Sequence, residues 1–290
     1  MSTEIKYTII TPVRDEEQYI EQTLRSVIAQ TITPTEWIIV DDGSIDRTGR
    51  IIDEYAQKYP WIHVVHRTNR GFRKAGSGVI DAFYDGYDVR RVEDGDFIIK
   101  LDGDLSFDKD YFQKSFDHFI RSPDIGIGGG AIYNVVNGAL MVEQHPQFHV
   151  RGATKIYRKE CWNAIGGLMH APGWDTLDEV KANMLGWKSR TFADLKVLHY
   201  RYTGAADGLW KTNVKYGRAN YVSGYHPLFM AFKCLKRVFD KPVLLGAVGI
   251  FYGYVSSYLK RMPQVDDKVL IAYIRKQQLN KIFMRETIWK

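Results

Sequence analysis

Two aspartates one residue apart follow an apolar run near the middle of the chain. The run FIIKL leads directly into Asp102, Gly103 and Asp104. Carboxylates at this spacing repel each other and raise each other's pKa unless a cation neutralises them. Mg²⁺ and Mn²⁺ accept such oxygen ligands and commonly complete their shell with substrate phosphates. The pattern therefore predicts a divalent-metal site for a phosphorylated substrate.

Further aspartates follow two other apolar runs. Asp15 comes shortly after YTIITPV, and Asp41 and Asp42 end the run EWIIVDD. Ligands of open parallel sheets bind outside the carboxyl ends of the strands. If these runs are parallel strands, the three aspartates lie with Asp102 and Asp104 on one acidic rim.

Alternating strands and helices would position these carboxylates. The apolar runs YTIITPV, EWIIVDD, IHVV and DFIIKLD predict four strands. The segments RDEEQYIEQTLRSVIAQT and SIDRTGRIIDEYAQKYP place apolar residues at helical spacing, and a third helix is expected from about Phe72 to Tyr84. This order predicts βαβ units in a parallel sheet, and the continuous apolar strands indicate a sheet covered on both faces. The predicted fold class is α/β.

The composition fits one large globular domain, alone or with an appendage. The chain has 290 residues, of which 45% are hydrophobic and 13% aromatic. Its two cysteines, Cys161 and Cys234, lack metal-ligand or disulfide-framework spacing and are expected to be buried thiols. The N-terminus lacks the basic, apolar, small-residue order of a secretory signal, so a cytoplasmic location is expected.

Positive charge is concentrated at the C-terminal end. Residues 231–290 carry 12 Lys and Arg against 4 Asp and Glu, whereas the whole chain has a formal net charge of +6. Aromatic residues there form an apolar run and are not interleaved with the basic ones, so no nucleic-acid partner is predicted. Two interpretations remain open: contact with an anionic membrane surface, or a solvated helical face.

Several segments in order carry a resemblance to a known family. They are TPVRDEEQYIEQTLRSVIAQTITPTEWIIVDDGSIDRTGRIIDEY, NRGFRKAG, LDGDLSF and GATKIYRKECWNAIGGL. Over roughly residues 5–200 the chain resembles the inverting glycosyltransferases of family 2. The resemblance implies a GT-A fold, with a Rossmann-like, mostly parallel central sheet flanked by helices. The catalytic domain would span 1–205, with a nucleotide-binding half over about 1–105 and an acceptor half over about 106–205, followed by a helical C-terminal region over 206–290.

The resemblance also assigns roles in donor binding. Pro12 and Asp15 would flank the nucleotide pocket, and Asp41 would receive the base. Asp102 would contact the ribose, and Asp104 would hold the Mn²⁺ or Mg²⁺ that bridges the donor diphosphate. The other predicted nucleotide-sugar contacts are Arg14, Asp42, Arg70, Lys74 and Gly103.

Inversion requires one base that takes the proton of the acceptor hydroxyl on the face opposite the leaving group. By the resemblance, this base is an Asp about three helical turns before a Gly-aromatic step. In APGWDTLDEVKANMLGWKSR the step is Gly186–Trp187, and counting back gives Asp175. Asp178 and Glu179 are rivals one turn further on. Alternatively, Asp175 is a helix N-cap and the other two compensate the helix dipole.

Three further residues could contact the metal or the diphosphate. His199, in LKVLHYRYTG, lies at about the distance where the family places a histidine near the metal, and a neutral imidazole suits Mn²⁺. Its alternative is a structural histidine at a strand end. Arg201 and Lys74 are candidate diphosphate contacts, and surface salt bridges are their alternative.

Two other patterns predict a structural role and not a ligand-binding one. GIGGG, residues 126–130, fails the dinucleotide-binding pattern and is expected to serve close backbone packing. HPQFH has two histidines, His145 and His149, without a neighbouring carboxylate, and is expected to be a loop and not a zinc site.

An uncharged segment lies within the basic C-terminal region. Pro242–Leu259 has no charge over 18 residues, and as a helix would measure about 27 Å, just short of a hydrocarbon core of about 30 Å. An interfacial or re-entrant helix fits it, and so does packing against the catalytic domain or a second copy of the chain. Processive synthases of the family carry a Gln-x-x-Arg-Trp motif, which this sequence lacks.

These patterns together predict metal-dependent, inverting, non-processive transfer of a single sugar. The donor would be a nucleotide-sugar, and the acceptor a glycan or lipid-linked saccharide in cell-surface polysaccharide or glycolipid synthesis. The enzyme would be cytoplasmic, either free or on the cytoplasmic face of the membrane. Two alternatives remain: a glycosyltransferase that acts on polyprenyl phosphate, and a non-catalytic nucleotide-sugar-binding partner.

Overall fold

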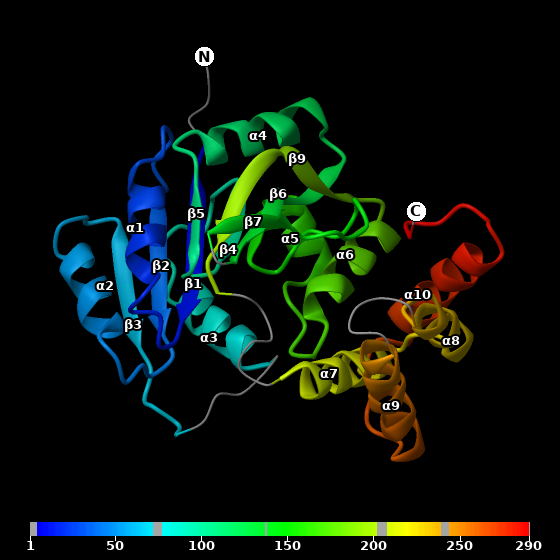
Figure 1. Cartoon of the computed structure of the whole chain (residues 1–290). Helices are drawn as coiled ribbons and strands as arrows, with labels where there is room; N and C mark the ends of the chain where they lie inside the picture. The colour runs from blue at the N-terminus through cyan, green and yellow to red at the C-terminus, as the bar shows by residue number, and fades with distance from the viewer. Residues whose placement is uncertain (1–4, 72–76, 137, 202–207, 239–243, 290) are drawn as a thin grey trace.

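A computed structural model describes residues 5–71, 77–136, 138–201, 208–238 and 244–289. A nine-stranded sheet forms its centre, in the order β3-β2-β1-β4-β8-β6-β9-β5, with β7 paired to β6 (Figure 1). The strands are β1 (Tyr7–Val13), β2 (Glu36–Asp41), β3 (Ile62–His66), β4 (Phe97–Leu101), β5 (Leu105–Phe107), β6 (Ile125–Val136), β7 (Ala139–Val142), β8 (Thr154–Arg158) and β9 (Lys188–His199). The helices are α1 (Ile20–Ile28), α2 (Thr48–Ala56), α3 (Ser77–Asp88), α4 (Tyr111–Arg121), α5 (Lys159–Ile165), α6 (Trp174–Met184), α7 (Leu209–Val222), α8 (Pro227–Lys236), α9 (Leu245–Leu259) and α10 (Lys268–Ile282).

The first four strands confirm the predicted parallel arrangement. β3, β2, β1 and β4 pair in parallel, and every residue of β2 and β4 is buried. Beyond β4 the sheet is mixed: β8 runs antiparallel to β4 and β6, whereas β9 runs parallel to β6. The α/β class with flanking helices is confirmed.

Two apolar cores cover the two faces of the sheet. One joins α1, α2 and α4 to the sheet through residues such as Leu24, Ile52 and Phe116, and the other joins α3, α5 and α6 through residues such as Phe83 and Trp162. The helix expected from about residue 72 to 84 is α3, which in the described residues runs from Ser77 to Asp88. Both cysteines are buried free thiols, as predicted.

Glycines in β6 confirm the predicted close backbone packing. A Cβ added to Gly129 would lie 2.5 Å from the Thr154 carbonyl oxygen, and one added to Gly130 would lie 2.6 Å from that of Leu195. β6 is therefore restricted to glycine where its neighbouring strands approach.

Gly129→Ala should lower the free energy of unfolding by about 1–3 kcal/mol, because the added methyl overlaps a backbone oxygen that only a shift of the strand can move. Urea unfolding measures the change. Gly246→Ala in α9 is the control, since its added Cβ meets nothing closer than Asn213 Oδ1 at 3.7 Å. Equal stability of both variants would contradict the packing argument.

The C-terminal helices pack on the rest of the chain through α6. A third core joins Leu177 and Val180 of α6 to residues of α7, α8, α9 and α10, including Tyr254 and Leu270. The predicted division near residue 205 falls within 202–207, outside the described residues, and stays a prediction. In the described parts of the chain, no helix has both the length and the apolar content to cross a membrane.

Candidate active site

The carboxyl ends of β1, β2 and β4 meet at one edge of the sheet (Figure 1). Val13 pairs with Asp41, and Ile10 pairs with Lys100. Gly103 then packs against β1, where an added Cβ would lie 2.6 Å from Val13 Cγ1. Only glycine fits there, so the turn after β4 holds Asp102 and Asp104 close to the end of β1.

Asp41 and Asp42 have different partners. Asp41 Oδ1 accepts from the Ser44 N–H at 2.8 Å, and its Oδ2 lies 3.1 Å from His66 Nδ1. Asp42 is buried and receives Arg67 at 2.6 Å and both Nη atoms of Arg70 at 2.8 and 2.5 Å. Asp42 thus orients the guanidinium groups of Arg67 and Arg70 beside the strand ends. Arg67 was not among the residues predicted from the sequence.

Asp15 and Arg14 connect the segments that follow β1 and β2. Asp15 has a left-handed backbone (φ 54°), and its Oδ1 accepts from the Ile45 N–H at 2.9 Å. Its own N–H donates to Ser44 Oγ at 3.0 Å. Arg14 Nη1 donates to the Asp42 carbonyl at 2.9 Å. These bonds fix the loop that would border a nucleotide.

Three other predicted contacts are placed as follows. Pro12 is half-buried within β1, beside Val40 of β2. Arg201 Nη2 donates to the Asp15 carbonyl at 2.6 Å and forms an ion pair with Glu16 at 2.9 Å. Arg201 therefore lies at the same rim, where it ties the end of β9 to the loop after β1. Lys74 lies outside the described residues.

Asp102 is paired with a lysine from its own strand. The buried Lys100 ammonium forms an ion pair with Asp102 and donates to the Gly152 carbonyl at 2.6 Å. Burial raises the pKa of Asp102; the Lys100 charge lowers it and the Asp104 charge raises it again, and the net shift is upward. The two aspartates therefore repel each other in the folded chain, and a cation between them would relieve that repulsion.

Asp104 and His199 offer two ligands to a metal ion. His199 Nε2 lies 3.3 Å from Asp104 Oδ2, and His199 Nδ1 lies 3.1 Å from Asn134 Oδ1. With Nδ1–H donated to the amide oxygen, Nε2 faces a carboxylate and needs either a proton or a cation. Burial lowers the pKa of His199, but its hydrogen bond with Asp104 and the charges of Asp104, Asp102 and Glu143 outweigh burial, so the net shift of this pKa is upward. Without a metal, the imidazole therefore tends to take the proton.

The donor set fits Mn²⁺ or Mg²⁺. Asp104 Oδ1 is buried and has no hydrogen-bond partner, which leaves an oxygen lone pair available for a cation. Among the described residues, no cluster of three or more His, Cys, Asp or Glu side chains could hold a metal alone. Asp104 and His199 would therefore share the ion with substrate oxygens.

Asp175 lies at the start of α6 with its carboxylate unpaired. The helix begins at Trp174 with Gly173 as N-cap, so the alternative that Asp175 is the N-cap is wrong. Within the described residues, its carboxylate makes no hydrogen bond or ion pair. Burial raises the pKa of Asp175, but the charges of His149, Lys155, Arg151 and Lys100 outweigh this effect and lower it. The carboxylate is therefore ionised at neutral pH.

A short chain of contacts connects Asp175 to the strand ends. A Cβ added to Gly152 would lie 3.4 Å from Asp175 Cβ, and the Gly152 carbonyl accepts from Lys100, the partner of Asp102. Lys100 Nζ also lies 5.5 Å from the ring of Trp174. The structure thus brings Asp175 near the acidic rim.

Asp178 and Glu179 belong to a fully buried ion-pair network. Lys155 Nζ donates to both oxygens of Asp178 at 2.8 and 2.9 Å and lies 2.9 Å from Glu179 Oε1. Tyr157 OH donates to Asp178 at 2.5 Å. His149 Nδ1 lies 2.9 Å from Glu179 Oε2, so this histidine, expected to lack a carboxylate neighbour, has one from 30 residues further along the chain. Neither carboxylate is open to an acceptor sugar.

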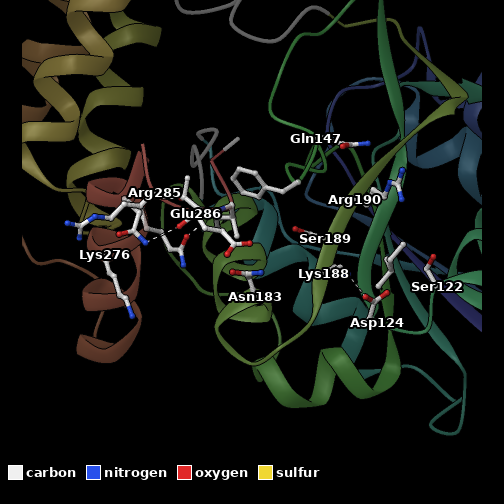
Figure 2. A pocket seen from close by; sticks show the side chains of 16 residues that line it. Ser122, Asp124, Gln147, Asn183, Lys188, Ser189, Arg190, Lys276, Arg285 and Glu286 are labelled. Atoms are coloured by element: carbon white, nitrogen blue, oxygen red, sulfur yellow. Dashed lines mark hydrogen bonds and ion pairs between the residues drawn. The ribbon is translucent and has the colours of Figure 1, made fainter. Parts of the chain in front are cut away.

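A polar cleft of about 930 Å³ lies at the far end of β9, between that strand and the C-terminal segment (Figure 2). Lys188 and Arg190 border it on one side, and Lys276 and Arg285 on the other. None of the described residues that line it is a predicted site residue. The 12-residue strand β9 separates it from His199.

Comparison with known proteins identifies the family. The family model described as Glycosyl transferase family 2 matches residues 8–172, more than half of the chain. This chain belongs to glycosyltransferase family 2. The match covers the ends of β1, β2 and β4 and stops just before Asp175, so the family assignment does not depend on the predicted base.

Individual relatives match shorter stretches. The uncharacterized glycosyltransferase EpsJ of Bacillus subtilis (strain 168) is 36% identical over 88 residues, which are 28% of this chain and 26% of EpsJ. Chondroitin synthase of Escherichia coli is 30% identical over 112 residues, 39% of this chain and 15% of the synthase. The chain thus spans about a quarter or less of the length of these two relatives.

Solved structures show the GT-A fold. The mannosyltransferase PcManGT of Pyrobaculum calidifontis, in complex with GDP-Man and Mn²⁺, superposes with a TM-score of 0.54 at 15% identity. The superposition covers 92% of this chain and 78% of that enzyme. The predicted GT-A fold of this glycosyltransferase is confirmed.

Proposed function

We propose that this glycosyltransferase transfers a single sugar from a nucleotide-sugar to a glycan or lipid-linked saccharide, with inversion and with Mn²⁺ or Mg²⁺. The observation that carries the proposal is the unpaired, ionised carboxylate of Asp175 beside the acidic rim formed by Asp102 and Asp104. The similarity to chondroitin synthase supports a role in polysaccharide synthesis.

Asp175 acts as the general base in this proposal. Its carboxylate takes the proton of the attacking acceptor hydroxyl, and the absence of a protein partner among the described residues leaves it free to do so. A single base opposite the leaving group makes the displacement inverting. Asp178, Glu179 and Lys155 position the helix start: Lys155 Nζ donates to the Asp175 carbonyl at 2.5 Å.

The strand-end residues hold the donor. Asp104 and His199 would hold the metal ion, which when bound neutralises charge on the departing diphosphate. Asp41 and Asp15 border the nucleotide, and Arg67 and Arg70, oriented by Asp42, supply positive charge near it. The Mn²⁺ and GDP-Man bound to PcManGT support a divalent cation and a nucleotide-sugar here.

Nucleotide binding tests the donor half. Calorimetric titration of UDP, GDP, dTDP and CDP should show one nucleotide that binds in the presence of Mn²⁺ and binds at least about tenfold more weakly without it. Asp104→Asn should abolish the Mn²⁺ effect, because it removes the charged ligand. Asp124→Asn, at the distant cleft, is the control and should bind like the wild type.

Two results would count against the proposal. A folded protein that binds none of the four nucleotides lacks the donor site. A protein that binds a nucleotide but releases no nucleoside diphosphate with any saccharide or polyprenyl-phosphate acceptor fits the non-catalytic binding partner. Turnover with polyprenyl phosphate but with no saccharide would mean that the acceptor is the lipid phosphate.

A further inference from the structure

α9 carries apolar side chains on two opposite faces. Ile250 and Tyr254 are buried in the C-terminal core, and Ala247 is buried as well. The opposite face is exposed: Val248 keeps 50% of its surface accessible, Phe251 48% and Tyr252 57%. A solvated helix would carry polar residues there, so this face requires an apolar or interfacial partner.

The neighbouring helices extend this surface. Trp210 of α7 is 41% exposed, and its ring centroid lies 6.0 Å from that of Tyr252. On α8, which packs against α9, Leu228, Phe232 and Leu235 recur at positions i, i+4 and i+7 and are all exposed. The three helices lie together at one end of the molecule, where α9 projects from it (Figure 1).

Positive charge surrounds these apolar side chains. The sequences of α7, α8 and α9 contain no Asp or Glu. Between residues 208 and 265 the chain has nine Lys and Arg and a single acidic residue, Asp240. Lys211, Lys236 and Lys260 are among the exposed cations on or next to the three helices. The partner is therefore expected to be anionic as well as apolar.

We propose that α7, α8 and α9 dock the protein on an anionic lipid surface. A second copy of the chain would supply apolar contact but would bring cations against cations. A bilayer surface satisfies both properties, because headgroups pair with Lys and Arg while the apolar side chains enter the acyl boundary. Trp210 and Tyr252 have the amphipathic rings that suit the headgroup level. The 15-residue α9 measures about 22 Å, so it lies in the interface without spanning.

Close packing between α7 and α9 keeps the surface intact in lipid. A Cβ added to Gly217 of α7 would overlap the Ile250 carbonyl oxygen, and one added to Gly253 of α9 would overlap that of Val214. Backbones that approach through small residues pack by van der Waals contact, which persists where lipid replaces water. The pair can therefore present its outer face to acyl chains without separating.

The docked surface is joined to the helix that carries Asp175. The turn after α7 packs against the start of α6, where a Cβ added to Gly173 would lie 2.7 Å from Ser223 Oγ. Ser223 Oγ donates to the Pro172 carbonyl at 3.4 Å. An acceptor anchored in the same lipid surface would thus be presented to the acceptor half. This last step, a lipid-linked acceptor, rests on the proposed function, whereas the docking itself does not.

Vesicle flotation of the full chain, without nucleotide or metal, tests the docking. The protein should float with vesicles that contain phosphatidylglycerol, float poorly with phosphatidylcholine alone, and be released by high salt, because screening weakens its attraction to the headgroups. Val248→Ser combined with Phe251→Ser should weaken partitioning by about tenfold or more. The control is Val89→Ser combined with Ile120→Ser, which removes side chains of similar exposure, 52% and 62%, just after α3 and in α4, away from the three docking helices.

Three outcomes would overturn the proposal. The first is a folded wild-type protein that does not float with either vesicle. The second is equal partitioning of the two double variants. The third is a dimer in light scattering that the Val248 and Phe251 changes dissociate, without vesicle binding by the wild type, which assigns the face to a second copy. Since no substrate is present, each result is independent of nucleotide binding and turnover.

Discussion

Asp175→Asn should lower turnover by about 100- to 10,000-fold, the range expected when a general base is lost. The carboxylate has no hydrogen-bond or ion-pair partner in the described residues, so the amide removes basicity without breaking a structural contact. The surrounding cations that lower the pKa of Asp175 tolerate a neutral amide in its place. The thermal midpoint and the calorimetric affinity for nucleotide and Mn²⁺ should stay close to those of the wild type.

A rate measured at saturating donor and acceptor distinguishes the loss of a general base from the loss of folded structure. Glu179→Gln is the matched variant, because it makes the same kind of change in a carboxylate that is fully buried and bonded to His149 and the Val150 N–H. It should lower stability first, with turnover following only through unfolding. An Asp175→Asn enzyme with an unchanged rate would mean that another group takes the proton.

The N-terminal half could be predicted from the sequence because its strands are continuous apolar runs. YTIITPV is β1 from its first to its last residue, and FIIKL is β4. Their parallel order follows from the helices between them, and the carboxylates at their ends follow from that order. The antiparallel pairing of β8 with β4 and β6 has no such local signal, since it depends on how the chain returns after long connections.

The candidate site was harder to predict where a role depends on burial. The spacing and the resemblance favour Asp175, but they leave Asp178 and Glu179 as rivals on the same helix. The structure separates them because Lys155, 23 residues before Asp178, reaches two of them and not the third carboxylate. Asn134, 65 residues before His199, orients that imidazole and was not identified for the same reason. Lysines inside apolar strands, such as Lys100 and Lys155, were the available signal for such networks.

Lys155→Met should lower the free energy of unfolding by about 3–5 kcal/mol at neutral pH, the range for breaking a buried ion pair by removing one partner. Lys155, Asp178 and Glu179 are all buried, so the substitution would leave Asp178 without a cation and Glu179 with His149 alone. Burial already raises the pKa of Asp178 to about 6, and loss of the Lys155 charge, which lowers this pKa, would raise it further. Folding would then favour the protonated form of Asp178, so the loss of stability should be largest at neutral pH and shrink as the pH falls through the raised pKa.

Urea unfolding at neutral and mildly acidic pH measures this change. Lys114→Met is the control, because Lys114 is exposed and pairs at 2.7 Å with Asp110, a partly exposed residue just before α4, so the midpoint should not move. Lys155→Met combined with Asp178→Asn and Glu179→Gln should recover part of the stability, since it removes the uncompensated charges and keeps their shapes. A single Lys155→Met variant as stable as the wild type at neutral pH would show that water or a shifted cation compensates the pair. In that case Lys155, which donates to the Asp175 carbonyl, would not be needed to position Asp175.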